Sequence, residues 1–182
     1  MKRSISIVLI LVLGLSFSAC GGGGGDDTPL PQGYITHNGV NYKEVTSPYT
    51  QKVWLDRNLG ASQACTALDD TACYGDYYQW GRNADGHENN ESNKIATQAT
   101  DINNVGHSDF ITSSGAYHYE WLDVNNNDVD DNGSLRTINW SKTDGSSVCP
   151  VGFRVPTIQE LKDETLDNTG GGCLCKQYRC LQ

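Results

Sequence analysis

The sequence predicts an irregular, turn-rich α+β domain. Three observations indicate this class: Gly, Asn, Asp, Ser and Thr are abundant, an Asn-Gly pair separates two alternating segments, and a later segment carries a helix-start signal. The sequence has no long segment in which apolar residues recur with the period of a helix. We therefore expect short strands joined by loops, with little helix.

The first expected element is a β-hairpin. Residues 34–36 and 40–45 alternate polar and apolar side chains around Asn38-Gly39. An Asn-Gly pair between alternating segments is a strong hairpin signal, because both residues accept the positive φ of a tight turn. Residues 53–55, Val-Trp-Leu, predict a further strand.

The expected helix covers residues 157–162. Pro156 precedes it, Thr157 can cap it, and Glu160 three residues later completes a capping box. This is the clearest helix signal in the sequence.

The N-terminus has the order of an export signal. Lys2 and Arg3 precede an apolar run over residues 5–15, and small residues lead to Cys20. The apolar run is too short to span a bilayer comfortably. This segment resembles a bacterial lipoprotein signal, which implies cleavage after residue 19 and acylation of Cys20. The alternative is a plain cleaved signal with an incidental cysteine.

Residues 20–32 predict a lipidated cysteine followed by a flexible Gly-rich tether. Acyl chains on Cys20 would hold the protein to a lipid bilayer. By resemblance to lipoprotein sorting, Gly21 favours the bacterial outer membrane or cell surface. The formal net charge of −9 disfavours nucleic acid as a partner.

The remaining chain fits one domain, residues 33–169, with three landmarks rich in glycine and aromatic residues. They lie at residues 53–60, 74–82 and 149–157. In this order they resemble the Fibrobacter succinogenes major paralogous domain family. The resemblance implies a secreted or surface bacterial domain of largely unassigned function, and not an enzyme with a known mechanism.

The third landmark also resembles the Arg-Val-Pro-Thr-x-x-Glu segment of formylglycine-generating and related C-type-lectin-like domains. Four residues carry this likeness: Arg154, Pro156, Thr157 and Glu160. It implies a C-type-lectin-like α+β fold. Four aromatic residues are expected to pack in the core rather than stack on a ligand: Trp54, Tyr78, Trp80 and Phe153.

The segment 170–182 is an atypical Cys-rich tail that matches neither the family pattern nor the acidic composition before it. A frameshifted or prematurely ended copy is the preferred interpretation, and a genuine Cys-rich ending is the alternative. If strands of the family fold are lost, the sheet would have an open edge.

Seven cysteines in an exported chain favour disulfides. Cys65 and Cys73 bracket a short polar loop and are the expected pair. Cys149 is expected to meet a tail cysteine, although six cysteines allow fifteen pairings.

A calcium site is the strongest cofactor candidate. Asp128, Asp130 and Asn132, followed by Gly133, match the first half of an EF-hand loop. The twelfth position of that loop is Asn139, which lacks the bidentate carboxylate. A bare turn-forming loop without calcium is the other interpretation.

These features predict a membrane-anchored lipoprotein that displays a non-enzymatic binding or adhesion domain, with a glycan or surface protein as ligand. The sequence contains no nucleophile elbow, phosphate loop or paired-acid motif. The alternative is a structural envelope lipoprotein or a nonfunctional truncated paralogue.

Overall fold

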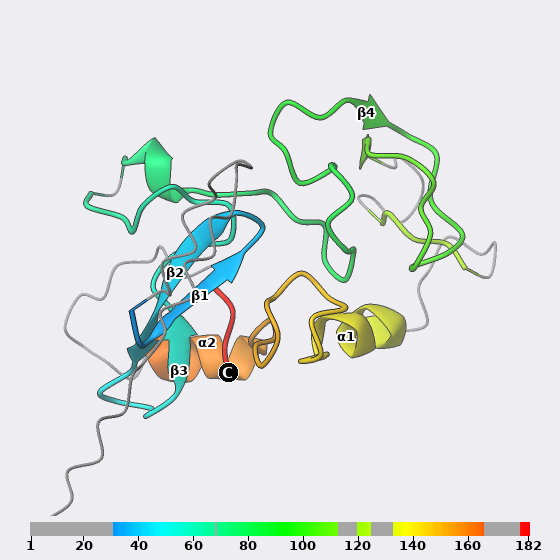
Figure 1. Cartoon of the computed structure of the whole chain (residues 1–182). Helices are drawn as coiled ribbons and strands as arrows, with labels where there is room; N and C mark the ends of the chain where they lie inside the picture. Colours follow the sequence, from blue (N-terminus) through cyan, green and yellow to red (C-terminus); the bar gives the residue numbers. More distant parts are fainter. Residues whose placement is uncertain (1–30, 68, 113–119, 125–132, 166–178) are drawn as a thin grey trace, which may run out of the picture.

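The computed structural model describes residues 31–67, 69–112, 120–124, 133–165 and 179–182. It has the mixed α+β composition that the sequence predicts. Three strands form one antiparallel sheet in the order β1-β2-β3, and two short strands, β4 and β5, pair in parallel. Figure 1 shows α2 beside the three-stranded sheet, whereas α1 lies with the β4 region at the other end of the molecule.

The hairpin is confirmed. β1 spans Tyr34–His37 and β2 spans Val40–Thr46, paired with His37 opposite Val40. Asn38 and Gly39 in the turn have φ angles of 48° and 76°, the positive pair that a type I′ turn requires. β3, Val53–Leu55, then pairs with β2 as the third strand.

The predicted helix is also confirmed and is longer than expected. α2 spans Ile158–Thr165. The Thr157 hydroxyl accepts the Glu160 amide at 3.2 Å, and the Glu160 carboxylate accepts the Thr157 amide at 2.9 Å. This reciprocal pair is the capping box. The same carboxylate binds Arg154 through both of its oxygens and Lys52 through one, which holds the helix start against the sheet.

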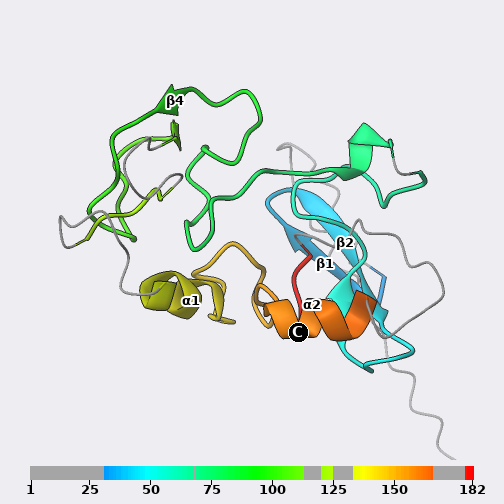
Figure 2. The same cartoon turned by 180° about the vertical axis from the view of Figure 1, so that it is seen from behind.

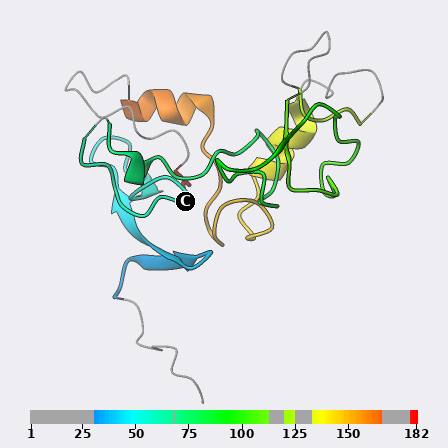
Figure 3. The same ribbon diagram turned by 90° about the horizontal axis from the view of Figure 1, so that it is seen from above.

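The sequence did not indicate four further elements. They are the 3₁₀ turn η1 at Thr71–Cys73, the strands β4 at Lys94–Ile95 and β5 at Phe110–Ile111, and the helix α1 at Ser134–Trp140. Figures 2 and 3 show that α1 and α2 stay apart when the molecule is turned, each with its own group of loops or strands.

The buried apolar side chains form two clusters. The larger cluster lies under the hairpin and β3, and it includes Tyr42, Leu55, Trp140 and Phe153. The smaller one is built on Ala99, Ile111, Trp121 and Leu122. α1 connects them: Trp140 belongs to the first cluster, while its indole Nε1 donates to the carbonyl of Arg82 at 3.2 Å.

Three of the four aromatic residues expected in the core are buried, namely Trp54, Tyr78 and Phe153. The expectation for Trp80 is wrong, because 47% of this residue is exposed. A Cβ on Gly133 would lie 2.3 Å from the Trp80 ring, and the Arg136 guanidinium lies 5.3 Å from the ring centroid. Trp80 thus lies at the surface, with Gly133 and Arg136 at the start of α1 beside one part of its ring.

The last residues of the chain cover an edge of the sheet. Leu181 is fully buried and bridges Trp54 on one side and Arg154 on the other. Leu181 and Arg154 exchange both backbone hydrogen bonds at 2.8 Å. Within the described residues, the tail therefore pairs with the edge of β3 that does not face β2.

Candidate functional site

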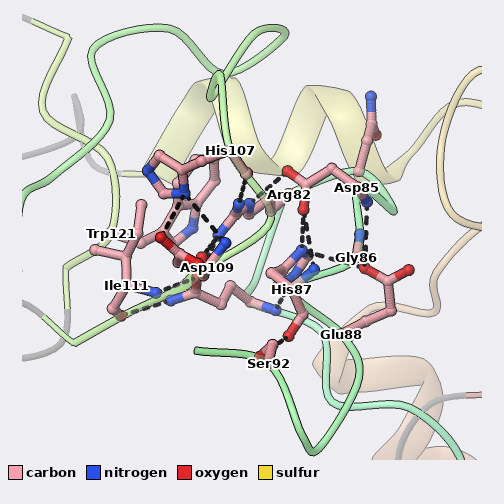
Figure 4. A network of polar contacts seen from close by, with 12 residues as sticks. Arg82, Asp85, Gly86, His87, Glu88, Ser92, His107, Asp109, Ile111 and Trp121 are labelled. Atoms are coloured by element: carbon pink, nitrogen blue, oxygen red, sulfur yellow. Dashed lines mark hydrogen bonds and ion pairs between the residues drawn. The ribbon is translucent and has the colours of Figure 1, made fainter. Parts of the chain in front are cut away.

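The guanidinium of Arg82 is completely buried and makes four hydrogen bonds. It donates to the Asp85 carboxylate at 2.8 Å and to the Gln79 side-chain oxygen at 2.8 Å. It also donates to the carbonyls of His107 at 2.8 Å and Asp109 at 2.9 Å. Figure 4 shows how Arg82 ties the 79–88 segment to the 107–111 segment.

Gln79 strengthens the same junction. Its side-chain amide donates to the Ile111 carbonyl at 2.9 Å, and its oxygen accepts the Ile111 amide at 3.1 Å. The side chain thus pairs with the edge of β5 that does not face β4. Gly81, with φ of 81°, lets the chain turn against α1, since a Cβ there would lie 2.3 Å from that of Arg136.

Asp85, His87 and Glu88 form the one group of three metal-ligating side chains found in the described residues, with ligand atoms within 4.8 Å of one another. The ring of His87 already uses both nitrogens. Nε2 accepts the Gln79 amide at 3.1 Å, so Nδ1 carries the proton and donates to Asp85 Oδ1 at 2.8 Å.

The two carboxylates of this group are also occupied by local donors. Glu88 accepts the backbone amides of Asp85 and Gly86, at 3.2 and 2.9 Å, and Asp85 accepts Arg82 and the His87 amide. These are the bonds of a closed turn. The cluster therefore fits a structural role better than a cation site, because neither nitrogen of His87 is free to bind a metal.

Burial of the His87 imidazole, together with the nearby Arg82 charge, lowers its pKa, and Asp85 and Glu88 oppose that shift. The folded protein thus favours neutral His87. A group whose pKa falls on folding stabilises the fold above its unfolded pKa, about 6.5 for histidine, and loses this contribution as the pH falls.

We therefore predict that the free energy of unfolding decreases between pH 7.5 and pH 5.5, by at most about 1.4 kcal/mol per pH unit from this one proton. Urea unfolding at both pH values measures the change. His87→Gln should flatten this pH dependence. His107 is partly exposed, so His107→Gln should leave the pH dependence unchanged. An equal slope in wild type and His87→Gln would contradict the prediction.

Two cysteine pairs are joined as disulfides. The expected Cys65–Cys73 bond closes the loop around η1. Cys149 pairs with Cys180, which identifies the tail cysteine that the sequence left open. Cys20 and the candidate calcium ligands Asp128, Asp130 and Asn132 lie outside the described residues.

A surface groove lies beside the exposed Trp80. It encloses about 430 Å³ between α1 and the start of α2, and its lining includes Trp140, Val155, Pro156 and Ile158. Polar groups at its rim are bonded locally: the Thr137 hydroxyl donates to the Gly133 carbonyl at 2.9 Å, for example. The groove is therefore mainly apolar.

A smaller cleft of about 270 Å³ combines two aromatic rings with amide, hydroxyl and ammonium groups. Its lining residues are Tyr77, Asn89, Asn90, Ser92, Lys94 and Phe110. A third hollow, of about 500 Å³, lies beside Arg82 and the loop of residues 102–108. Sequence reasoning indicated none of these sites, because their walls come from loops far apart in the chain.

A scan against protein-family models, a search of curated proteins and a search of solved structures each found no match. The resemblance to the Fibrobacter succinogenes major paralogous domain therefore stays a prediction. Among the described residues, none of the helices has the length and apolar character needed to cross a membrane.

Proposed function

We propose that this chain is a bacterial lipoprotein, anchored through Cys20 to the outer membrane or cell surface, that displays a non-enzymatic binding domain. The proposal includes membership of the Fibrobacter succinogenes major paralogous domain family and a C-type-lectin-like form of the α+β fold. The export-signal order of residues 2–20 and the flexible tether support the anchor.

One observation carries the binding role: Tyr77 and Trp80 project aromatic rings to the surface beside two separate hollows. Both residues are 47% exposed, although they flank the buried Tyr78 and Gln79. Exposed aromatic side chains at hollows are typical of ligand and partner sites, because they offer a large apolar area with few rotatable bonds.

The anchor is tested by metabolic labelling with palmitate in cells that express the full-length chain. We expect wild type and a Cys173→Ser control to carry the label and to enter the detergent phase. Cys20→Ser should do neither, because its hydroxyl cannot form the thioether to lipid. Equal labelling of Cys20→Ser would contradict the proposed anchor.

The binding role is tested by incubating the purified full-length lipoprotein with solubilised envelope glycans and proteins. Reproducible retention of an envelope component, lost after heat denaturation of the lipoprotein, supports a binding domain. Retention of nothing would contradict that role and favour a structural envelope lipoprotein or a nonfunctional paralogue.

A further inference from the structure

We propose that the cleft between Tyr77 and Phe110 binds a pyranose sugar that bears a carboxylate, such as a uronic acid at the end of a glycan. The proposal rests on the proposed binding function and assigns its ligand class and site. Its support comes from three properties of the cleft: fixed aromatic walls, free hydrogen-bonding groups and a single positive charge.

The aromatic walls are held in place by the backbone. The Tyr77 amide donates to the Glu88 carbonyl at 2.7 Å, and the Phe110 amide donates to the Asn93 carbonyl at 2.7 Å. Behind them, the buried His87 ring lies 6.2 Å from the Phe110 ring, centroid to centroid. The two hydrogen bonds fix the backbone from which the two rings project, so little backbone entropy is lost when a flat ligand face packs against the rings.

Some polar groups of the cleft already make hydrogen bonds within the protein, and others are available to a ligand. The Ser92 hydroxyl donates to the His87 carbonyl at 2.9 Å, and the Asn89 side-chain oxygen accepts the Glu91 amide at 2.9 Å. In the described part of the chain, the Tyr77 hydroxyl, the Asn90 amide and the Lys94 ammonium have no such partner. These groups match a ligand with several hydroxyls.

The groove beside Trp80 offers fewer available hydrogen-bonding groups than the Tyr77 cleft. Hydroxyls of Thr137, Ser141 and Thr157 and the amide of Gln159 are all engaged in local hydrogen bonds there. A sugar placed in that groove would find few free donors to replace the water around its hydroxyls, which is unfavourable. The Tyr77 cleft is therefore the better sugar site.

Charge narrows the ligand class further. Lys94 is the one ionised residue among the six that line the cleft, and Glu91 in the same turn is not among them. In a chain of net charge −9 this local cation favours an anionic group on the ligand. The volume of about 270 Å³ lies just below the range of about 300–1,000 Å³ for drug-sized ligands, which suits one sugar ring.

The test uses the purified full-length lipoprotein in detergent and titrates it with trigalacturonate, followed by calorimetry. The matched ligand is the methyl-esterified trimer, which keeps the rings and removes the charge. We expect wild type to prefer the acid by about twofold to fivefold, the range for one exposed ion pair. Lys94→Gln should abolish this preference, whereas Lys162→Gln on α2 should keep it.

Tyr77→Ala should weaken binding of both trimers by about tenfold or more, which corresponds to about 1.4 kcal/mol. Tyr49→Ala, another exposed tyrosine, is the control and should bind as wild type does. No binding of either trimer, or binding unaffected by Tyr77→Ala, would overturn the sugar site. Retention of an envelope component that survives Tyr77→Ala would leave the binding function standing and place it elsewhere.

Discussion

Arg82→Met is expected to lower the free energy of unfolding by about 3–5 kcal/mol, because it leaves several acceptors without their donor, at about 1–3 kcal/mol for each buried one. Arg82 is fully buried, and its loss leaves the Asp85 carboxylate without its cation. It also removes the two N–H donors that bind the carbonyls of His107 and Asp109. Urea unfolding measures the loss.

Two variants make this prediction specific. Arg82→Lys should recover only part of the loss, because an ammonium cannot reach the several acceptors that the planar guanidinium serves. Arg154→Met removes a guanidinium that is 25% exposed, and it should cost about 1 kcal/mol. Equal losses for Arg82→Met and Arg154→Met would show that burial of Arg82 does not matter.

The second large effect is expected for the double variant Cys149→Ala/Cys180→Ala. This disulfide joins residues 31 positions apart, and closing such a loop in the unfolded chain contributes about 3–4 kcal/mol on the chain-entropy account. Because Cys180 precedes Leu181, the variant should also release the tail from β3. Urea unfolding gives the stability, and hydrogen exchange of the Leu181 amide reports the release.

The matched control is Cys65→Ala/Cys73→Ala, which opens a loop of only eight positions. We expect this loss to be about 2–3 kcal/mol and therefore smaller. The Leu181 amide should stay protected in this control. Protection of that amide in both double variants would mean that backbone pairing alone holds the tail.

The parts of the fold that the sequence predicts are set by local chemistry. Asn38-Gly39 specifies its turn, and Thr157 with Glu160 specifies the start of α2, through bonds between residues at most three positions apart. β4 and β5 could not be predicted in this way, because each has only two residues and they pair across about fifteen positions of the chain. α1 begins after Gly133 without a side-chain cap, so its start carries no sequence signal.

The candidate sites also divide into features set by residues close in sequence, which were predictable, and features set by distant residues, which were not. Cys65 and Cys73 are close in sequence, and their pairing was predictable. Trp80 was misassigned to the core because a short motif does not reveal how much of an aromatic ring the rest of the chain covers. The neighbours of this ring, Gly133 and Arg136, lie more than fifty residues later. The Tyr77 cleft likewise takes its second wall from Phe110, a pairing that no local pattern indicates.

The position of Trp80 has a spectroscopic consequence. The chain has four tryptophans, of which Trp54, Trp121 and Trp140 are buried. The fluorescence of the folded protein therefore has two components. Three buried indoles are shielded from an aqueous quencher such as acrylamide, whereas the Trp80 indole is accessible to it. Without any attached dye, the emission reports separately on what happens at the α1 surface and on whether the interior has opened.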